Sequence, residues 1–82
     1  MPMGTVRAFN TAKGYGFITP DDGGADLYAH VNAIEWTPHE SGGIEQGERV
    51  LFEIEPGPAG KLDAAVRIRV RGRAAETKGA TG

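Results

Sequence analysis

The amino-acid sequence predicts an all-β protein. Thirteen glycines and five prolines divide the 82 residues into short segments, and these residues commonly mark turns. No window of helical length repeats apolar residues at three- and four-residue spacing, whereas residues 48–55 alternate apolar and polar side chains, the pattern of a strand with one buried face. The chain is also shorter than the usual domain of roughly 100 to 200 residues, so we expect a single domain.

The first three strands are predicted from turn signals. Residues 3–10 and 15–19 have the composition of strands, and residues 11–14 join them with a connector of hairpin length, so the two strands should pair antiparallel. Residues 20–24 combine proline, aspartate and glycine, which favour turn dihedrals. They should reverse the chain into a third strand at 26–30.

The last two strands follow from period-two alternation. In residues 48–55, and again at the end of residues 61–70, apolar side chains occupy every second position, and the positions between are charged except for Leu51. The first set should therefore face inward and the arginines outward. The apolar residues expected inside the protein are Val6, Phe9, Ile18, Leu27, Val50, Phe52, Ile54, Val66, Ile68 and Val70.

Two further segments lack strand periodicity. Residues 32–47 should form a long loop, with a helical turn at 32–35 as one interpretation. Residues 71–82 contain no large apolar side chain and cannot offset their ordering entropy by burial, so we expect a domain at 1–70 and a disordered tail. Five short strands with turn-rich links favour a five-stranded antiparallel barrel such as the OB-fold. Periodicity alone does not separate it from an SH3-like barrel.

Composition excludes several classes of function. The chain has no cysteine, so disulfides and thiolate metal sites are ruled out and a reducing compartment is compatible. The first ten residues do not resemble a secretion signal, and no apolar stretch approaches the roughly 18 residues of a membrane span. A domain this small has no room for a deep catalytic cavity. We therefore expect a cytoplasmic protein without enzymatic activity.

The net charge of −2 argues mildly against a polyanionic partner, but the charges are unevenly distributed. Residues 1–66 carry four lysines and arginines against ten carboxylates, which gives −6, and residues 67–82 carry five against one, which gives +4. Cations at the C-terminal end could therefore attract phosphates.

Four flat side chains are predicted to share one surface. Period two places Tyr15 and Phe17 on one face of their strand, and Tyr28 and His30 on one face of the next. Adjacent strands would combine them into a platform on which nucleic-acid bases stack, at about 1 to 3 kcal/mol per base. Aromatic residues more often fill a core, but here Ile18 and other apolar residues occupy the opposite parity. The exposed platform is the favoured interpretation.

These segments closely resemble the bacterial cold-shock domain. Residues 4–10, residues 13–23, which include KGYGFI, and residues 26–30 match its first RNP motif and a slightly altered second motif, in order and at the family's spacing. The likeness extends over 1–68, weakens after residue 34 and returns at 46–54. It implies an OB-type barrel that binds single-stranded RNA and DNA with low sequence specificity, as an RNA chaperone or transcription antiterminator.

The resemblance also implies roles for individual residues. Tyr15, Phe17, Tyr28 and His30 would stack on bases, Arg7 and Lys13 would contact phosphates or base edges, and Asn10 and Asp26 would hydrogen-bond bases. Trp36 lies in the long loop, where family members often carry an additional aromatic residue. It could fold over the platform or instead cap an end of the barrel. The nucleic-acid-binding residues expected are thus Arg7, Asn10, Lys13, Tyr15, Phe17, Asp26, Tyr28, His30 and Trp36.

The chain departs from the family pattern at two stacking positions. Ala8 stands where the family usually has a tryptophan, and Val31 where it often has a phenylalanine. If each had held a base, about 2 to 6 kcal/mol of stacking would be missing. A barrel that has shifted to protein binding, with weak nucleic-acid binding, is therefore the alternative function.

Other chemistry has little support in the sequence. His30 and His39 lack the further ligands of a tetrahedral metal site, so no metal or other cofactor is expected. Asp26, His30 and Ser41 have the residue types of a hydrolase triad but no accompanying nucleophile motif. We also expect a monomer with no small-molecule substrate and no membrane partner.

Overall fold

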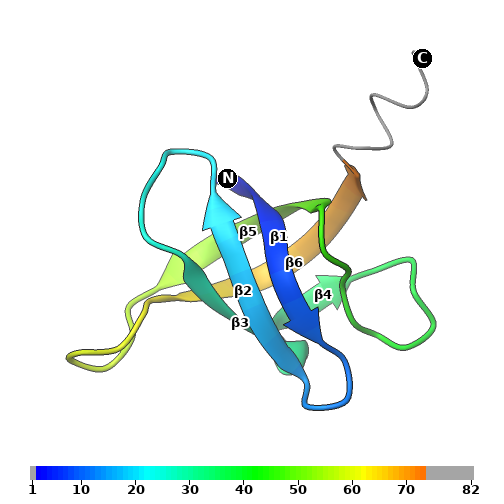
Figure 1. The fold of residues 1–82 in the computed structure, drawn as a ribbon, viewed down its shortest axis with the longest axis horizontal. Helices are drawn as coiled ribbons and strands as arrows, with labels where there is room; N and C mark the ends of the chain where they lie inside the picture. The colour runs from blue at the N-terminus through cyan, green and yellow to red at the C-terminus, as the bar shows by residue number, and fades with distance from the viewer. Residues whose placement is uncertain (1, 74–82) are drawn as a thin grey trace.

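A computed structural model describes residues 2–73 and shows an all-β barrel (Figure 1). Five strands form it, with a short 3₁₀ helix, η1, and a short strand, β4, inserted after the third. The elements are β1 (Met3–Asn10), β2 (Tyr15–Pro20), β3 (Leu27–His30), η1 (Val31–Ala33), β4 (Ile34–Trp36), β5 (Glu48–Glu55) and β6 (Ala64–Arg73). The predicted fold class is confirmed.

The sheet order β3-β2-β1-β5-β6-β4 closes through an additional pairing of β3 with β6. The β1–β2, β2–β3, β1–β5 and β5–β6 pairs are antiparallel, as predicted, but the closing β3–β6 pair is parallel. It joins Tyr28 to Ala64 and Ala29 to Ala65, and the amide of Tyr28 donates to the carbonyl of Asp63 at 2.9 Å. Closure leaves β2 and β3 side by side, each with one face outward.

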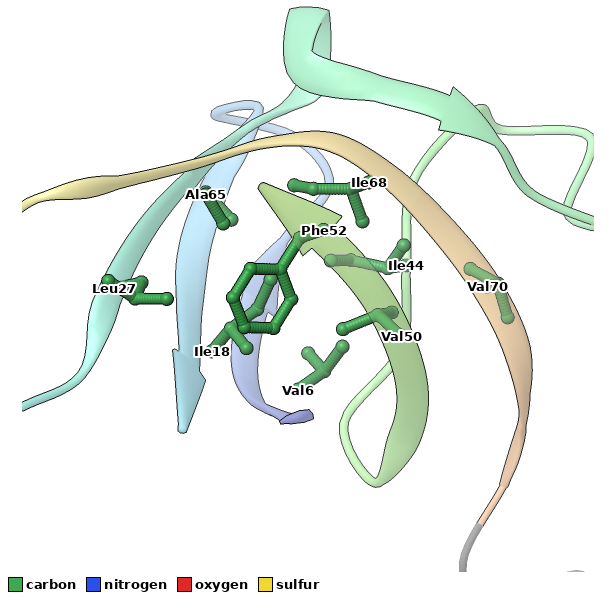
Figure 2. Close-up of a cluster of buried hydrophobic side chains, with 10 residues drawn as sticks. Val6, Ile18, Leu27, Ile44, Val50, Phe52, Ala65, Ile68 and Val70 are labelled. Atoms are coloured by element: carbon green, nitrogen blue, oxygen red, sulfur yellow. The ribbon is translucent and has the colours of Figure 1, made fainter. Parts of the chain in front are cut away.

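The interior is filled by ten apolar side chains from all five barrel strands and the long loop. Figure 2 shows this cluster, with the Phe52 ring directed into it from β5. Phe52 is its largest member, and Ile18 is fully buried beside it in the same cluster. The cluster consists of Val6, Ile18, Leu27, Ala29, Ile44, Val50, Phe52, Ala65, Ile68 and Val70.

Three residues predicted to be inside the protein lie elsewhere. Ile54 is the second-last residue of β5 and is 46% exposed. Val66 is half-buried and outside the core cluster, and Phe9 only packs against the edge of that cluster. Conversely, Ile44 of the predicted loop is buried. The long loop therefore contributes to the core, whereas some strand positions predicted to be inward do not.

Two strands carry β-bulges that period-two alternation does not anticipate. In β1 the register shifts between Val6 and Ala8, and in β6 it shifts opposite Leu51 and Glu53. Near the second shift, Arg67 has a positive φ of 52°, which non-glycine residues seldom adopt. The extra residue brings Ala65 and Ile68 to the same side and turns Val66 away from the core. Bulges thus account for the Val66 correction.

The predicted loop 32–47 contains more structure than expected. Its start forms η1 and β4, and β4 pairs parallel with β6. Its end is fixed by Glu48, which is 3% exposed and accepts hydrogen bonds from the backbone of Glu45 and from Nε2 of His39, both at 2.7 Å. A buried carboxylate needs such partners. The Glu48–His39 pair therefore ties the long loop to the barrel.

The C-terminal boundary differs slightly from the predicted one. Strand β6 continues to Arg73, so residues 71–73 of the predicted tail are strand. Residues 74–82, the remainder of that tail, lie outside the described residues.

An ion pair ties the turn after β2 to β5. Arg49 donates to Asp21 through both terminal nitrogens at 2.7 and 2.6 Å, and Nη1 also donates to Thr5 of β1 at 3.0 Å. The hydrogen bond from Arg49 lowers the pKa of Asp21 below its ordinary value of 3.8, and the positive charge adds to this effect. A lowered pKa means that the pair stabilises the fold above pH 3.8 and that this stabilisation is lost as the carboxylate protonates.

Ile18→Ala should lower the free energy of unfolding by about 2 to 5 kcal/mol, because it leaves a cavity in the core. Ile54→Ala is the matched control, since Ile54 is 46% exposed and loses little burial. Urea denaturation of the three proteins measures the difference. Equal losses for the two variants would contradict the assigned burial.

Asp21→Asn should destabilise the protein at pH 7, and the difference from the unsubstituted protein should disappear as the pH falls well below 3.8. Asp22→Asn is the control, because Asp22 accepts a backbone hydrogen bond from Gly24 and an asparagine oxygen can do the same. Thermal melts across this pH range test the prediction, which a pH-independent difference would overturn.

Candidate nucleic-acid interface

Four rings lie together on the outer face of β2 and β3, and we call this set the ring platform: Tyr15, Phe17, Tyr28 and His30. Register places Phe17 opposite Tyr28 and Tyr15 opposite His30. The ring centroids of Tyr15 and Tyr28 lie 6.0 Å apart in a stacked arrangement, and Phe17 meets both rings edge-on at 6.3 and 6.2 Å. The Tyr28 and His30 centroids are 6.4 Å apart. All four side chains are half-buried, so ring surface remains accessible.

Alternate positions in the same strands explain why the rings face outward. Ile18, Leu27 and Ala29 point into the core, and neighbouring residues in a strand point to opposite faces. Gly16 lies on this inner side, where a Cβ would collide with the backbone of Ala8 and Phe9. The glycine therefore lets β1 approach β2 closely behind the ring platform.

Strand β1 continues the outer face on the other side of β2. Asn10 is opposite Tyr15 and Ala8 is opposite Phe17, and both are exposed. Ala8 presents only a methyl group beside the Phe17 ring. The outer face therefore carries only a small side chain at the position where the sequence lacks a large aromatic residue.

Asn10 and Lys13 belong to the turn between β1 and β2. The backbone amide of Lys13 donates to Oδ1 of Asn10 at 2.9 Å, and the amide of Gly14 donates to the carbonyl of Asn10 at 2.7 Å. Gly14 has a φ of 77°, a left-handed conformation that glycine adopts without strain. Asn10 thus shapes the turn that carries the exposed Lys13 side chain next to Tyr15.

His30 is oriented by its own backbone neighbourhood. Its Nδ1 accepts a hydrogen bond from the amide of Asn32 at 3.1 Å and so caps η1. In the neutral ring the proton must then be on Nε2. Val31, the next residue, is half-buried and faces the turn, where its amide donates to the carbonyl of Gly14 at 2.8 Å. Val31 therefore supports the turn behind the ring platform.

Arg7 and Asp26 form an ion pair across the outer face. Nη1 of Arg7 lies 2.5 Å from Oδ2 of Asp26, and the hydroxyl of Thr19 donates to Oδ1 of Asp26 at 3.1 Å. The pair spans from β1 across β2 to the residue before β3. The structure thus brings eight of the nine predicted site residues onto one face or its adjoining turn: Arg7, Asn10, Lys13, Tyr15, Phe17, Asp26, Tyr28 and His30.

Trp36 lies apart from the ring platform. It is in β4, is 55% exposed, and pairs with Arg69 of β6. It lines a groove of about 900 Å³ with Pro38, His39, Arg69 and Arg71 among others. A second hollow, of about 540 Å³, runs from His30 to Glu35, which also lines the Trp36 groove. The exposed ring does not cap the core, and this hollow lies between it and the platform.

Two arginines of β6, Arg67 and Arg69, are compensated by glutamates that sequence reasoning did not single out. Glu35 lies 2.7 Å from Arg69 and 3.6 Å from Arg67, and Glu53 lies 3.7 Å from Arg67. The parallel β4–β6 pairing brings Glu35 to these arginines. Nothing in the local sequence pattern indicates this pairing, because it joins segments more than thirty residues apart.

Comparisons with known proteins agree with this geometry. The family model described as "'Cold-shock' DNA-binding domain" matches residues 2–70. The chain belongs to the cold-shock domain family. A "Probable cold shock protein A" of Mycobacterium tuberculosis is 43% identical over 67 residues, which cover 82% of this chain and 97% of the relative. The "Major cold shock protein" of Micrococcus luteus is 45% identical over 65 residues, covering 79% and 92%. Membership supports nucleic-acid binding by this cold-shock domain.

In the described part of the chain, the three residues that have the types of a hydrolase triad have other hydrogen-bond partners. Asp26 is engaged by Arg7 and Thr19, His30 by the amide of Asn32, and the Ser41 hydroxyl by the amide of Gly43. The described residues contain no group of three or more His, Asp or Glu side chains placed to hold a metal ion. Within residues 2–73, no helix is long and apolar enough to cross a membrane.

Proposed function

We propose that the protein binds single-stranded RNA and DNA with low sequence specificity by stacking bases on Tyr15, Phe17, Tyr28 and His30. The observation that carries this proposal is the grouping of four neighbouring rings, half-exposed, on one face of a filled barrel. Every base has a flat π-face, so such a surface binds many sequences. RNA chaperoning or transcription antitermination, by a cytoplasmic monomer, is the activity we propose on this basis.

Cations at the margins of the ring platform supply phosphate contacts in this proposal. Lys13 is exposed in the turn beside Tyr15, and Arg7 lies beyond Phe17 with 67% of its side chain exposed. Asn10 is the polar residue next to Tyr15. Trp36 extends the site by one ring, reached from His30 along the hollow that ends at Glu35.

Tyr15→Ala, Phe17→Ala and Tyr28→Ala should each weaken binding of a dT oligonucleotide by about 1 to 3 kcal/mol, because each removes a stacking surface. The barrel should remain folded, since these side chains are not in the core. Fluorescence anisotropy of labelled oligonucleotides measures the affinity. Leu51→Ala is the control, an apolar outer-face change on β5 away from the ring platform.

The salt dependence of binding separates stacking from charge. For single strands each lost phosphate contact reduces the slope of log K against log salt by about 0.7, so Lys13→Gln should flatten this slope. Phe17→Ala should lower the affinity without changing the salt slope. Unchanged affinity in all three ring variants would refute stacking on this face.

Ala8→Trp should strengthen binding of dT oligonucleotides by up to about 1 to 3 kcal/mol, because it adds a further stacking surface beside Phe17. Titrations of the variant and the unsubstituted protein, with thermal melts to verify folding, test this prediction. Equal or weaker binding by a folded variant would show that bases do not pass over β1.

A further inference from the structure

The bulge in β1 exposes two consecutive residues on the face that carries the ring platform. Val6 pairs with Ile18 and Ala8 pairs with Phe17, so two steps along β1 match one step along β2. Val6 is buried, and both Arg7 and Ala8 are exposed. Bulges commonly re-aim a side chain beside a functional site. Here the bulge brings Ala8 to the outer face next to Arg7, which alternation from Val6 already places there.

The Arg7 guanidinium is anchored through one of its nitrogens. Its Nη1 donates to Oδ2 of Asp26, and the other oxygen of Asp26 accepts from the Thr19 hydroxyl. Asp26 is itself largely covered, whereas 67% of the Arg7 side chain remains exposed. A carboxylate fixed at both oxygens thus positions an otherwise flexible cation. Because a guanidinium has five N–H donors in a planar fork, most of its donors remain available to a ligand.

An anchored arginine fork next to a small side chain has a preferred ligand among the bases. Arginine donates bidentately to O6 and N7 of guanine, the only base that presents two acceptors side by side on that edge. In single strands this edge is unpaired and accessible. Adenine presents a donor beside N7, so it pairs poorly with an arginine.

From this geometry we infer that Arg7 recognises guanine at the position over Ala8, with Asp26 acting as a positioning residue rather than a base contact. This inference rests on the proposed single-strand binding, to which it adds a base preference. The small Ala8 side chain is part of the device, because a large ring there would occupy the space that the guanine needs. A good bidentate contact of this kind corresponds to about 5- to 150-fold discrimination.

A base scan tests the inference. One guanine is placed at each position of a short dT oligonucleotide in turn, and the affinity of the full chain for each is compared with that for the dT parent. At one position guanine should bind at least about 5-fold more tightly, and adenine at that position should not. Hypoxanthine, which keeps O6 and N7 but lacks the 2-amino group, should retain the preference, and 7-deazaguanine should lose most of it.

Variants assign the preference to the predicted residues. Arg7→Lys keeps the charge but loses the planar fork, so the ratio of guanine to thymine affinities should fall. Asp26→Asn should lower the same ratio, although it removes a negative charge and so favours phosphates in general. Glu40→Gln, which removes an exposed negative charge from the loop after β4, is the control for Asp26→Asn and should leave the ratio unchanged. Thermal melts verify that the variants are folded.

Each alternative outcome is distinct. If Arg7 only contacts a phosphate, Arg7→Lys will preserve the ratio and all bases will bind alike at every position, which overturns the inference and leaves stacking intact. A preference that survives 7-deazaguanine but not hypoxanthine would place the contact on the Watson–Crick edge and contradict the role of Arg7. No binding to any oligonucleotide would refute the proposed function itself.

Discussion

The small volume enclosed by the closed barrel is the constraint on which the other features of this structure depend. Phe52 and nine smaller apolar side chains fill it, and closure through the β3–β6 pair fixes which face of each strand is inside. Since Ile18 and Leu27 occupy the inner positions of β2 and β3, their neighbours Phe17 and Tyr28 must lie outside. The platform is therefore a consequence of core packing, and the core needs no contribution from its rings.

The fold and most of the candidate site could be predicted because β2 and β3 are short strands in which inward and outward side chains alternate without a bulge. In such strands, alternate residues point to the same side of the barrel. The outward positions of Tyr15, Phe17, Tyr28 and His30 could therefore be predicted from their spacing alone. The turn residues predicted the hairpin of β1 and β2. The close approach of β1 at Gly16 explains why the KGYGFI segment has a glycine at this position. Only the family resemblance indicated that this surface binds nucleic acid, because periodicity does not show what a surface binds.

The features that sequence could not predict depend on pairing between distant segments. The bulges in β1 and β6 arise from register against partner strands, so Ala8 and Val66 face outward without any local signal. The inward position of Glu48 follows from strand alternation, because it is two residues before Val50. Its partner His39, however, lies in a loop that has no repeating pattern of apolar residues. Likewise, Glu35 meets Arg67 and Arg69 only because β4 pairs with β6.

These ion pairs also change the meaning of the charge distribution. Glu35 and Glu53 form ion pairs with arginines of β6 and so offset part of the positive charge of the C-terminal segment. Asp26 offsets the charge of Arg7 in the same way. Exposed pairs of this kind contribute little to stability, but they reduce the field that a phosphate backbone would meet. With a net charge of −2, the protein offers weak long-range attraction to nucleic acid. In the proposed function, affinity must then come mainly from short-range contacts on the outer face of β1 to β3, where ring stacking and an oriented guanidinium act at contact distance.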